Sequence, residues 1–334
     1  MSTTHSKPDL PPLGPGWAGA VMGLGITASL MDIHLSSTLG HLPAELMLGV
    51  ATLLASALTV GFLRRRNPGF HSSAMPAWGM ASMGILALGS AYSLIFGAWP
   101  VHAFCWAVGT VLGAITCVKF FRYLFVSRPA PAFTWGLPLV APMVAATASA
   151  QLAPHVGAWG STVHGIGVAC FALAWVTAVP TFAFVYARTF PTIPTQFATT
   201  AWIPLGLVGQ STVAAQLLAG EQWHFRAMVY GIVMLSVGIP LACYAICQHW
   251  GTALGGAPMP YNPTWWASTF PVGTCCLGTH TLAEKSTNSA LLAWDLGWMD
   301  TISAALLVLL LLHVAWSVLG ARQLSHKSAV GVVG

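Results

Sequence analysis

Neutral polar side chains stand inside long apolar segments of this sequence, where hydrogen-bonding groups are scarce. They are the hydroxyls and one amide of Ser82, Thr147, Ser149, Gln210, Ser211, Thr212, Thr269 and Thr274. Such dipoles stabilise an anion without holding it as firmly as a fixed Arg or Lys would. Each hydroxyl also has an ordinary partner in its own helix, the carbonyl four residues back. We therefore expect these residues either to line a polar path or to be satisfied locally.

Ionisable side chains within the apolar segments are few, and each is a candidate for function because a charge in hydrocarbon is costly. Asp300 lies in the last apolar segment and is a candidate for proton coupling. Lys119 and Arg122 end the fourth segment. They either reach the membrane interface along their alkyl stems or attract anions to an opening.

The twelve histidines raise the alternatives of haem binding and pH sensing. Five lie in or at the ends of apolar segments: His34, His102, His164, His280 and His313. A membrane-bound b-type haem needs two histidines at similar depth, which His164 and His313 do not provide. The sequence has no C-x-x-C-H motif, zinc-ligand spacing, nucleophile elbow or phosphate loop. It therefore predicts no catalytic residue, no metal and no cofactor.

The amino-acid composition indicates what kind of secondary structure contains these residues. Of 334 residues, 56% are hydrophobic and only 6% are Asp, Glu, Lys or Arg, whereas a soluble domain has about 25% charged residues. This excludes a soluble enzyme, a nucleic-acid-binding protein and a disordered chain. The formal charge of +5 is spread over short loops. The sequence predicts an all-α polytopic membrane protein whose partner is the lipid bilayer, with no nucleic acid.

Ten uncharged runs are long enough to cross a bilayer as helices, which takes about 20 apolar residues. They cover residues 14–34, 43–63, 73–97, 101–125, 134–153, 160–186, 198–219, 227–248, 264–283 and 296–320. We expect a single ten-helix transmembrane domain at 14–321, with cytoplasmic tails at 1–13 and 322–334.

Lys and Arg are distributed unequally between the two sides of this arrangement. With the N-terminus inside, ten of the 12 lie on the inner side, and only Arg226 and Lys285 lie outside. Cytoplasmic loops are rich in Lys and Arg. Both termini are therefore predicted to be cytoplasmic, in a multi-pass protein of the plasma (inner) membrane.

A proline recurs near the start of each odd-numbered segment. The five are Pro15, Pro76, Pro138, Pro204 and Pro271, at intervals of about 61 to 67 residues. The stretches around them are rich in Gly, Ala, Ser and Thr, which let helices approach closely. We expect five helical hairpins with quasi-fivefold symmetry, in which the odd-numbered helices, kinked at all but the first of these prolines, surround a central pore. The alternative is that the proline pattern is only architectural.

One repeat has an aromatic residue directly before its proline. This position is held by Gly14, Met75, Leu137, Ile203 and Phe270. Under approximate fivefold symmetry, these residues occupy similar heights, and Phe270 has the largest ring to place on the axis. Phe270 is therefore a candidate pore gate, with packing between helices as the alternative.

These same stretches resemble a known family. NPTWWASTFPVGTCCLGT at 262–279 is similar to the ninth-helix segment of the tellurite-resistance/dicarboxylate transporter family. WIPLGLVGQSTVAA at 202–215 and LPLVAPMVAATASA at 137–150 resemble its seventh and fifth helices, and PAWGMASMGILALG at 76–89 is a looser match to the third. The family includes bacterial tellurite-resistance permeases, fungal malate permeases, sulfite efflux pumps and plant slow-type anion channels.

The resemblance implies ten helices in five hairpins around a pore, and a homotrimer with one pore in each protomer. It also implies that a Phe at the position of Phe270 occludes the pore. The implied function is transport of small inorganic or organic anions through a Phe-gated channel or permease. The substrates of the family are too varied to select the anion.

Two other functions stay open at this point. One is a proton-coupled carrier for a C4-dicarboxylate, sulfite or another oxyanion, in which Asp300 or a histidine moves the proton. The other is a membrane haem redox subunit, which the histidine spacing favours least.

Overall fold

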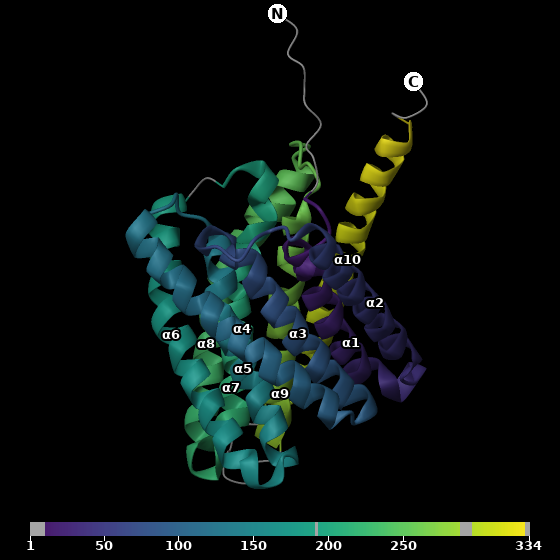
Figure 1. Ribbon diagram of the computed structural model, residues 1–334. Coiled ribbons are helices and arrows are strands. Elements are labelled where there is room, and N and C mark those ends of the chain that lie inside the picture. The colour runs from purple at the N-terminus through teal and green to yellow at the C-terminus, as the bar shows by residue number, and fades with distance from the viewer. Residues whose placement is uncertain (1–10, 191–192, 288–295, 331–334) are drawn as a thin grey trace, which may run out of the picture.

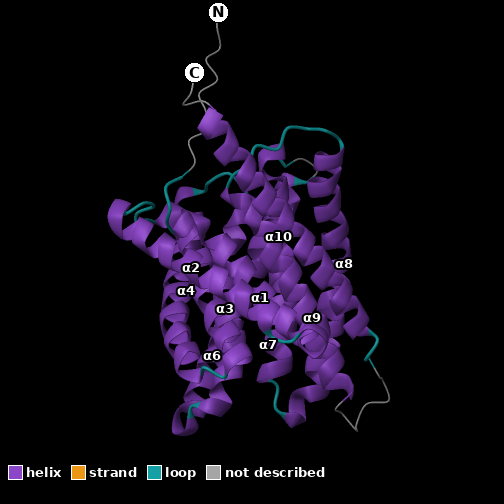
Figure 2. Ribbon diagram, turned by 90° about the vertical axis from the view of Figure 1, so that its right-hand side faces the viewer, coloured by secondary structure: helices purple, strands orange, loops and turns teal. Residues whose placement is uncertain are grey.

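The computed structural model describes residues 11–190, 193–287 and 296–330. Within these ranges every regular element is a helix (Figure 2). The α-helices of this part are α1 (Ala18–Leu39), α2 (Leu42–Arg65), α3 (Met75–Phe96), α4 (Trp99–Ser127), α5 (Gly136–Leu152), α6 (Gly160–Thr189), α7 (Ile203–Leu218), α8 (His224–Leu254), α9 (Thr269–Thr287) and α10 (Met299–Val330). Each predicted run overlaps one of them, and several helices extend beyond the predicted bounds, so the all-α fold with ten helices is confirmed.

Nine of the described helices are long and apolar enough to cross a membrane, as expected of a multi-pass membrane protein. The exception is α9, whose second half carries His280, Glu284 and Lys285. This helix packs against α1, α7, α8 and α10. None of these three residues is buried, and Glu284 is exposed. The low hydropathy of α9 therefore comes from its last turns, whereas its first half is buried among other helices.

Burial divides the helices into an inner and an outer set. In the most apolar stretch of the spans that contain α1, α3, α5 and α7, 61–89% of the residues are buried, against 17–39% for α2, α4, α6, α8 and α10. The outer set also carries most of the large exposed apolar side chains, such as Leu53, Phe104 and Val176. The even-numbered helices therefore form the surface that faces lipid, and the odd-numbered helices form the interior.

The contacts between the inner helices close into a ring. α1 packs on α3, α3 on α5, α5 on α7, α7 on α9, and α9 returns to α1. Each outer helix packs on its own inner partner and on the next inner helix along the chain, and α10 continues this order by contacting α9 and α1. The order of contacts repeats five times, as the spacing of the prolines predicts.

Glycine allows the inner helices to approach closely at two points of the ring. A Cβ on Gly79 of α3 would lie 2.6 Å from the Cα of Pro138 in α5. A Cβ on Gly209 of α7 would overlap the backbone of Thr274 and Cys275 in α9. A side chain at either position would push the neighbouring backbone away. The absence of a side chain is thus what lets α3 approach α5 and α7 approach α9.

The repeat prolines lie where each inner segment begins its α-helix. Pro76 and Pro204 occupy the first turn of α3 and α7, and Pro138 and Pro271 are each the third residue of their helix. A 3₁₀ turn precedes each helix: Ser72–Ala74, Phe133–Trp135, Thr195–Trp202 and Pro263–Ser268. A first-turn proline removes no helical hydrogen bond, since its N–H would be unpaired in any case. Each of these prolines therefore follows directly on a change from 3₁₀- to α-helix, and none of them interrupts the hydrogen bonds in the middle of an α-helix.

The first and last helices share one end of the bundle. α1 begins and α10 ends on the same side (Figures 1 and 2). α10 continues as a helix to Val330, past the predicted boundary at 321. We call this side the terminal end and the other side the far end. α1, α3, α5, α7 and α9 all run from the terminal end towards the far end.

Candidate functional site

The ring of inner helices encloses a cavity of about 100 Å³. Every inner helix contributes to its wall. The lining residues are Ile26, Ser29 and Ile33 from α1, Ala87, Ser90 and Leu94 from α3, Val144, Thr147 and Gln151 from α5, Gln210 from α7, and Phe270 and Leu277 from α9. The cavity therefore lies on the axis of the ring, where the sequence places a pore.

Phe270 lines this cavity on the side towards the terminal end. Every other lining residue follows the proline of its own repeat, whereas Phe270 precedes Pro271. Its side chain is 3% exposed, so it is enclosed by the surrounding helices. Of the residues at this repeat position, Met75, Leu137 and Ile203 are also buried, yet Phe270 is the one that lines the cavity.

The wall of the cavity is neutral. Its polar members are Ser29, Ser90, Thr147, Gln151 and Gln210. Ser90 donates to the side-chain oxygen of Gln151 at 2.8 Å, and Ser29 to the Gly25 carbonyl at 3.4 Å. The remaining lining residues are apolar, so an anion in the cavity meets dipoles and hydrocarbon but no fixed charge.

Two polar atoms of the wall have no partner within the described part of the chain. They are Oγ1 of Thr147 and Oε1 of Gln210, in side chains that are each 3% exposed. Buried polar groups are nearly always hydrogen-bonded, and an unpaired one costs about 1–3 kcal/mol. Their position against the cavity makes them available to a polar species that enters it.

The other predicted polar residues lie away from the cavity. Five of them donate to a carbonyl three or four residues back: Ser149 to Ala145, Ser211 and Thr212 to Val208, Thr269 to Trp266, and Thr274 to Pro271. Ser82 donates to the Gly109 carbonyl of α4 at 2.7 Å. The five hydroxyls have the local partners that the sequence offers as their alternative, whereas Ser82 joins α3 to α4.

Three polar lining residues, Ser29, Ser90 and Gln151, are not among the sequence-based candidates. A pattern in the sequence does contain them. Positions 26, 29 and 33 of α1, 87, 90 and 94 of α3, and 144, 147 and 151 of α5 share the spacing i, i+3, i+7. This spacing marks one face of a helix. The middle position is a Ser or Thr in all three stripes.

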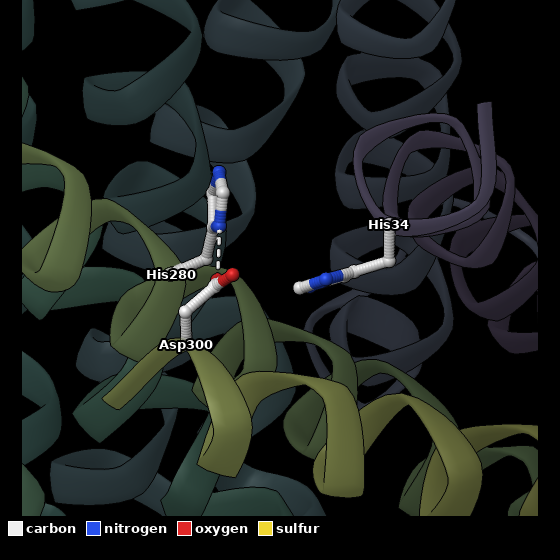
Figure 3. Close-up of side chains that lie close together, drawn as sticks. All are labelled: His34, His280 and Asp300. Carbon is white, nitrogen blue, oxygen red and sulfur yellow. Dashed lines mark hydrogen bonds and ion pairs between the residues drawn. The ribbon is translucent and has the colours of Figure 1, made fainter. Parts of the chain in front are cut away.

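The ionisable candidates lie at the two ends of the bundle. Lys119 and Arg122 line a separate surface hollow of about 710 Å³ beside Ser72, and Lys119 Nζ donates to the Phe70 carbonyl at 2.7 Å. Asp300 lies in the first turn of α10 at the far end, where His280 Nδ1 donates to its Oδ1 at 2.7 Å (Figure 3). None of these three residues lines the central cavity.

Two histidines considered for haem binding have partners in different parts of the protein. His164 Nε2 lies 3.1 Å from the Leu218 carbonyl, between α6 and α7. His313 of α10 is fully buried, and its Nε2 accepts from the Trp250 indole at 3.2 Å. The structure therefore does not bring these two imidazoles together.

The comparison with known families agrees with this geometry. The sequence model of the voltage-dependent anion channel family matches residues 12–321, which include the whole inner ring. No curated protein matches the chain. The match covers far more than half of the sequence, and it confirms the resemblance drawn from the helix motifs. The chain therefore belongs to the voltage-dependent anion channel family, whose members are channels and transporters for anions.

Proposed function

We propose that the protein conducts small anions through the cavity enclosed by α1, α3, α5, α7 and α9, and that Phe270 gates this path. The observation that carries the proposal is that Phe270 lines a cavity to which every inner helix contributes. A buried aromatic ring at the terminal side of such a cavity is an apolar plug. An anion passes it only when the ring moves aside, because hydrophobic constrictions exclude water and ions.

The neutral wall supports conduction in preference to tight binding. Transport needs binding that is favourable enough for entry and weak enough for exit. Thr147 and Gln210 offer polar groups without partners, and no Arg or Lys lines the cavity. The unpartnered hydroxyl of Thr147 can donate to an anion, whereas the unpartnered atom of Gln210 is its amide oxygen, so Gln210 stabilises an anion only when the amide turns its N–H groups to the cavity.

The direct test compares wild type with Phe270→Ala in liposomes loaded with an anion-sensitive dye. Removing the ring should raise anion flux by about tenfold or more, the effect of removing about 1.4 kcal/mol from the barrier. Phe120→Ala is the matched control, because Phe120 of α4 is also buried, at 2% exposure, and does not line the cavity. If the variant melts at the same temperature as wild type in detergent and the two proteins give equal flux, Phe270 only packs between helices.

A proton-coupled carrier is the second candidate function. The specific observation in its favour is the contact between His280 and Asp300, two titratable groups at the far end. In this case, uptake saturates and stops when the pH gradient is collapsed, and Asp300→Asn loses transport. Flux that follows only the anion gradient would exclude the carrier and leave the channel.

We also propose a plasma (inner) membrane location with both termini in the cytoplasm, and a homotrimer. Arg64, Arg65, Arg66 and Arg128 are all at the terminal end, where helices α2 and α4 finish, in agreement with the excess of basic residues in cytoplasmic loops. Cysteine labelling from each side of the membrane tests the orientation. Native mass spectrometry in detergent tests the trimer.

A further inference from the structure

Three side chains at the far end of the bundle form a compact cluster outside the central cavity. His34 comes from α1, His280 from α9 and Asp300 from α10 (Figure 3). One ligand atom from each residue lies within 4.8 Å of the other two. The ring of His34 extends towards the other pair, and the two imidazole centroids are 5.3 Å apart. The fold thus places two imidazoles and a carboxylate around one point.

The ligand types match a specific class of ion. Two imidazole nitrogens and one carboxylate oxygen suit a borderline divalent transition metal such as Zn²⁺, bound at about 2.0–2.2 Å from each atom. Tetrahedral coordination at these lengths needs ligand atoms somewhat more than 3 Å apart, which small rotamer changes provide from the present spacing. Three protein ligands leave a fourth position for water.

Solvent reaches the cluster from the far end. The side chain of Asp300 is 51% exposed and that of His280 is 25% exposed. An ion therefore has an entry path that does not pass through the central cavity. The carboxylate supplies negative charge, and no Lys or Arg of the described residues forms an ion pair with it.

Neighbouring groups hold the ligands in place. His34 Nε2 lies 2.9 Å from Oγ of Ser303, one helical turn after Asp300. Ser303 Oγ also donates to the Cys276 carbonyl of α9 at 2.8 Å. Ser303 and Cys276 are both fully buried. Such outer contacts orient metal ligands, and their loss typically lowers metal affinity by about 10–100-fold.

From this geometry, we propose that His34, His280 and Asp300 bind one divalent transition-metal ion of the Zn²⁺ class at the far end of the bundle. The ion would join α1 to α9 and α10, where the last hairpin meets the first and the inner ring closes. It would therefore hold the ring closed at the far end. This inference does not depend on transport, and its test measures binding alone.

The chain contains a matched control for the site. At the same end of the bundle, His41 Nδ1 donates to Asp32 Oδ1 at 2.6 Å. This pair also joins one imidazole to one carboxylate. Unlike His280 and Asp300, however, it does not belong to a group of three possible metal ligands among the described residues. If metal binding requires three ligands, replacing His41 should leave the metal affinity unchanged.

The experiment is isothermal titration of tag-free, metal-stripped protein in detergent with ZnCl₂. We expect one Zn²⁺ per chain, with a dissociation constant in the micromolar range or tighter. Co²⁺ should give visible absorption of the strength that four-coordinate sites produce. His280→Gln and Asp300→Asn should each weaken binding by about 100-fold or more, and Ser303→Ala by about tenfold. His41→Gln should bind as wild type does.

Melting curves distinguish loss of metal binding from loss of folding in the variants. Zn²⁺ should raise the melting temperature of wild type and His41→Gln, because a ligand of the folded state stabilises it. The same addition should leave His280→Gln unchanged. No binding by folded wild type, or equal binding by His280→Gln and wild type, would overturn the proposal.

Discussion

The central cavity and the far-end cluster differ in the kind of group that they expose to a passing ion. The cavity is surrounded by the inner helices and lined by apolar side chains and neutral dipoles, with Phe270 among its lining residues. The cluster is half open to solvent and consists of ionisable groups from α1, α9 and α10. Neutral groups suit ions that must leave quickly, whereas ionisable groups suit ions that stay. The comparison teaches that this fold keeps charged side chains out of the central cavity and places His34, His280 and Asp300 at the far end.

The strongest way to break this difference is to place a charge in the cavity. Val144→Asp, made in the Phe270→Ala background, should lower anion flux by about 100-fold. A carboxylate about 5 Å from the path, at an effective dielectric constant of about 20, opposes an anion by about 3 kcal/mol. Liposome flux measures the effect, and the neutral isostere Val144→Asn is the control. Equal flux from the two variants would mean that anions do not pass Val144.

Changes to the size of the side chain at position 270 test the terminal side of the cavity. Phe270→Leu should conduct more than wild type but less than Phe270→Ala, because part of the apolar plug remains. Phe270→Tyr keeps the ring and should stay closed. Single-channel recording in planar bilayers gives the order of the three. Conduction that does not follow side-chain volume would contradict a steric gate.

The polar atoms of the wall are expected to have a smaller effect. In the Phe270→Ala background, Thr147→Val should reduce flux by about fivefold, the equivalent of one hydrogen bond of about 1 kcal/mol. Gln210→Leu should act in the same direction. Thr274→Val is the control, since Thr274 donates to the Pro271 carbonyl and does not line the cavity. A loss of flux in Thr274→Val as large as in Thr147→Val would refute a special role for the unpaired atoms.

The smallest effect concerns the His41–Asp32 pair. The hydrogen bond and the charge of Asp32 raise the pKa of His41 above its ordinary value. A raised pKa in the folded state stabilises the protein below about pH 6.5, the ordinary histidine value, and this contribution disappears as the pH rises through the folded-state pKa. Wild type should melt slightly above His41→Gln at pH 5.5, and both should melt together at pH 8.5. Because His41 is exposed, salt should reduce the difference at pH 5.5. A difference that grows with pH would exclude this mechanism.

The inner ring was predictable because its signal is repeated along the chain. Apolar runs give ten helices, and the spacing of the prolines separates an inner set from an outer set. The position of Phe270 before Pro271 was identified by the same repeat and by the family motif around it. Each of these features depends on residues that are close together in the sequence, so it can be recognised without knowing how the helices pack.

The wall of the cavity was only partly predictable. Thr147 and Gln210 line it, whereas Ser211 and Thr212, directly beside Gln210, bond within their own helix. A helix that is apolar on all sides has no amphipathic face, so its sequence does not indicate which side meets the axis. The i, i+3, i+7 stripes of α1, α3 and α5 become meaningful only when the three helices stand around one space.

The sequence by itself determined a ten-helix membrane protein, its family and the candidate gate, because hydropathy, repeat spacing and motifs are properties of neighbouring residues. The tertiary structure alone decided which polar side chains face the cavity and which bond locally. It alone also brought His34 to His280 and Asp300, which are more than 200 residues away in the chain. The physical reason is the closure of the ring: the last hairpin packs against the first helix, and no pattern along the sequence records which atoms meet at that seam.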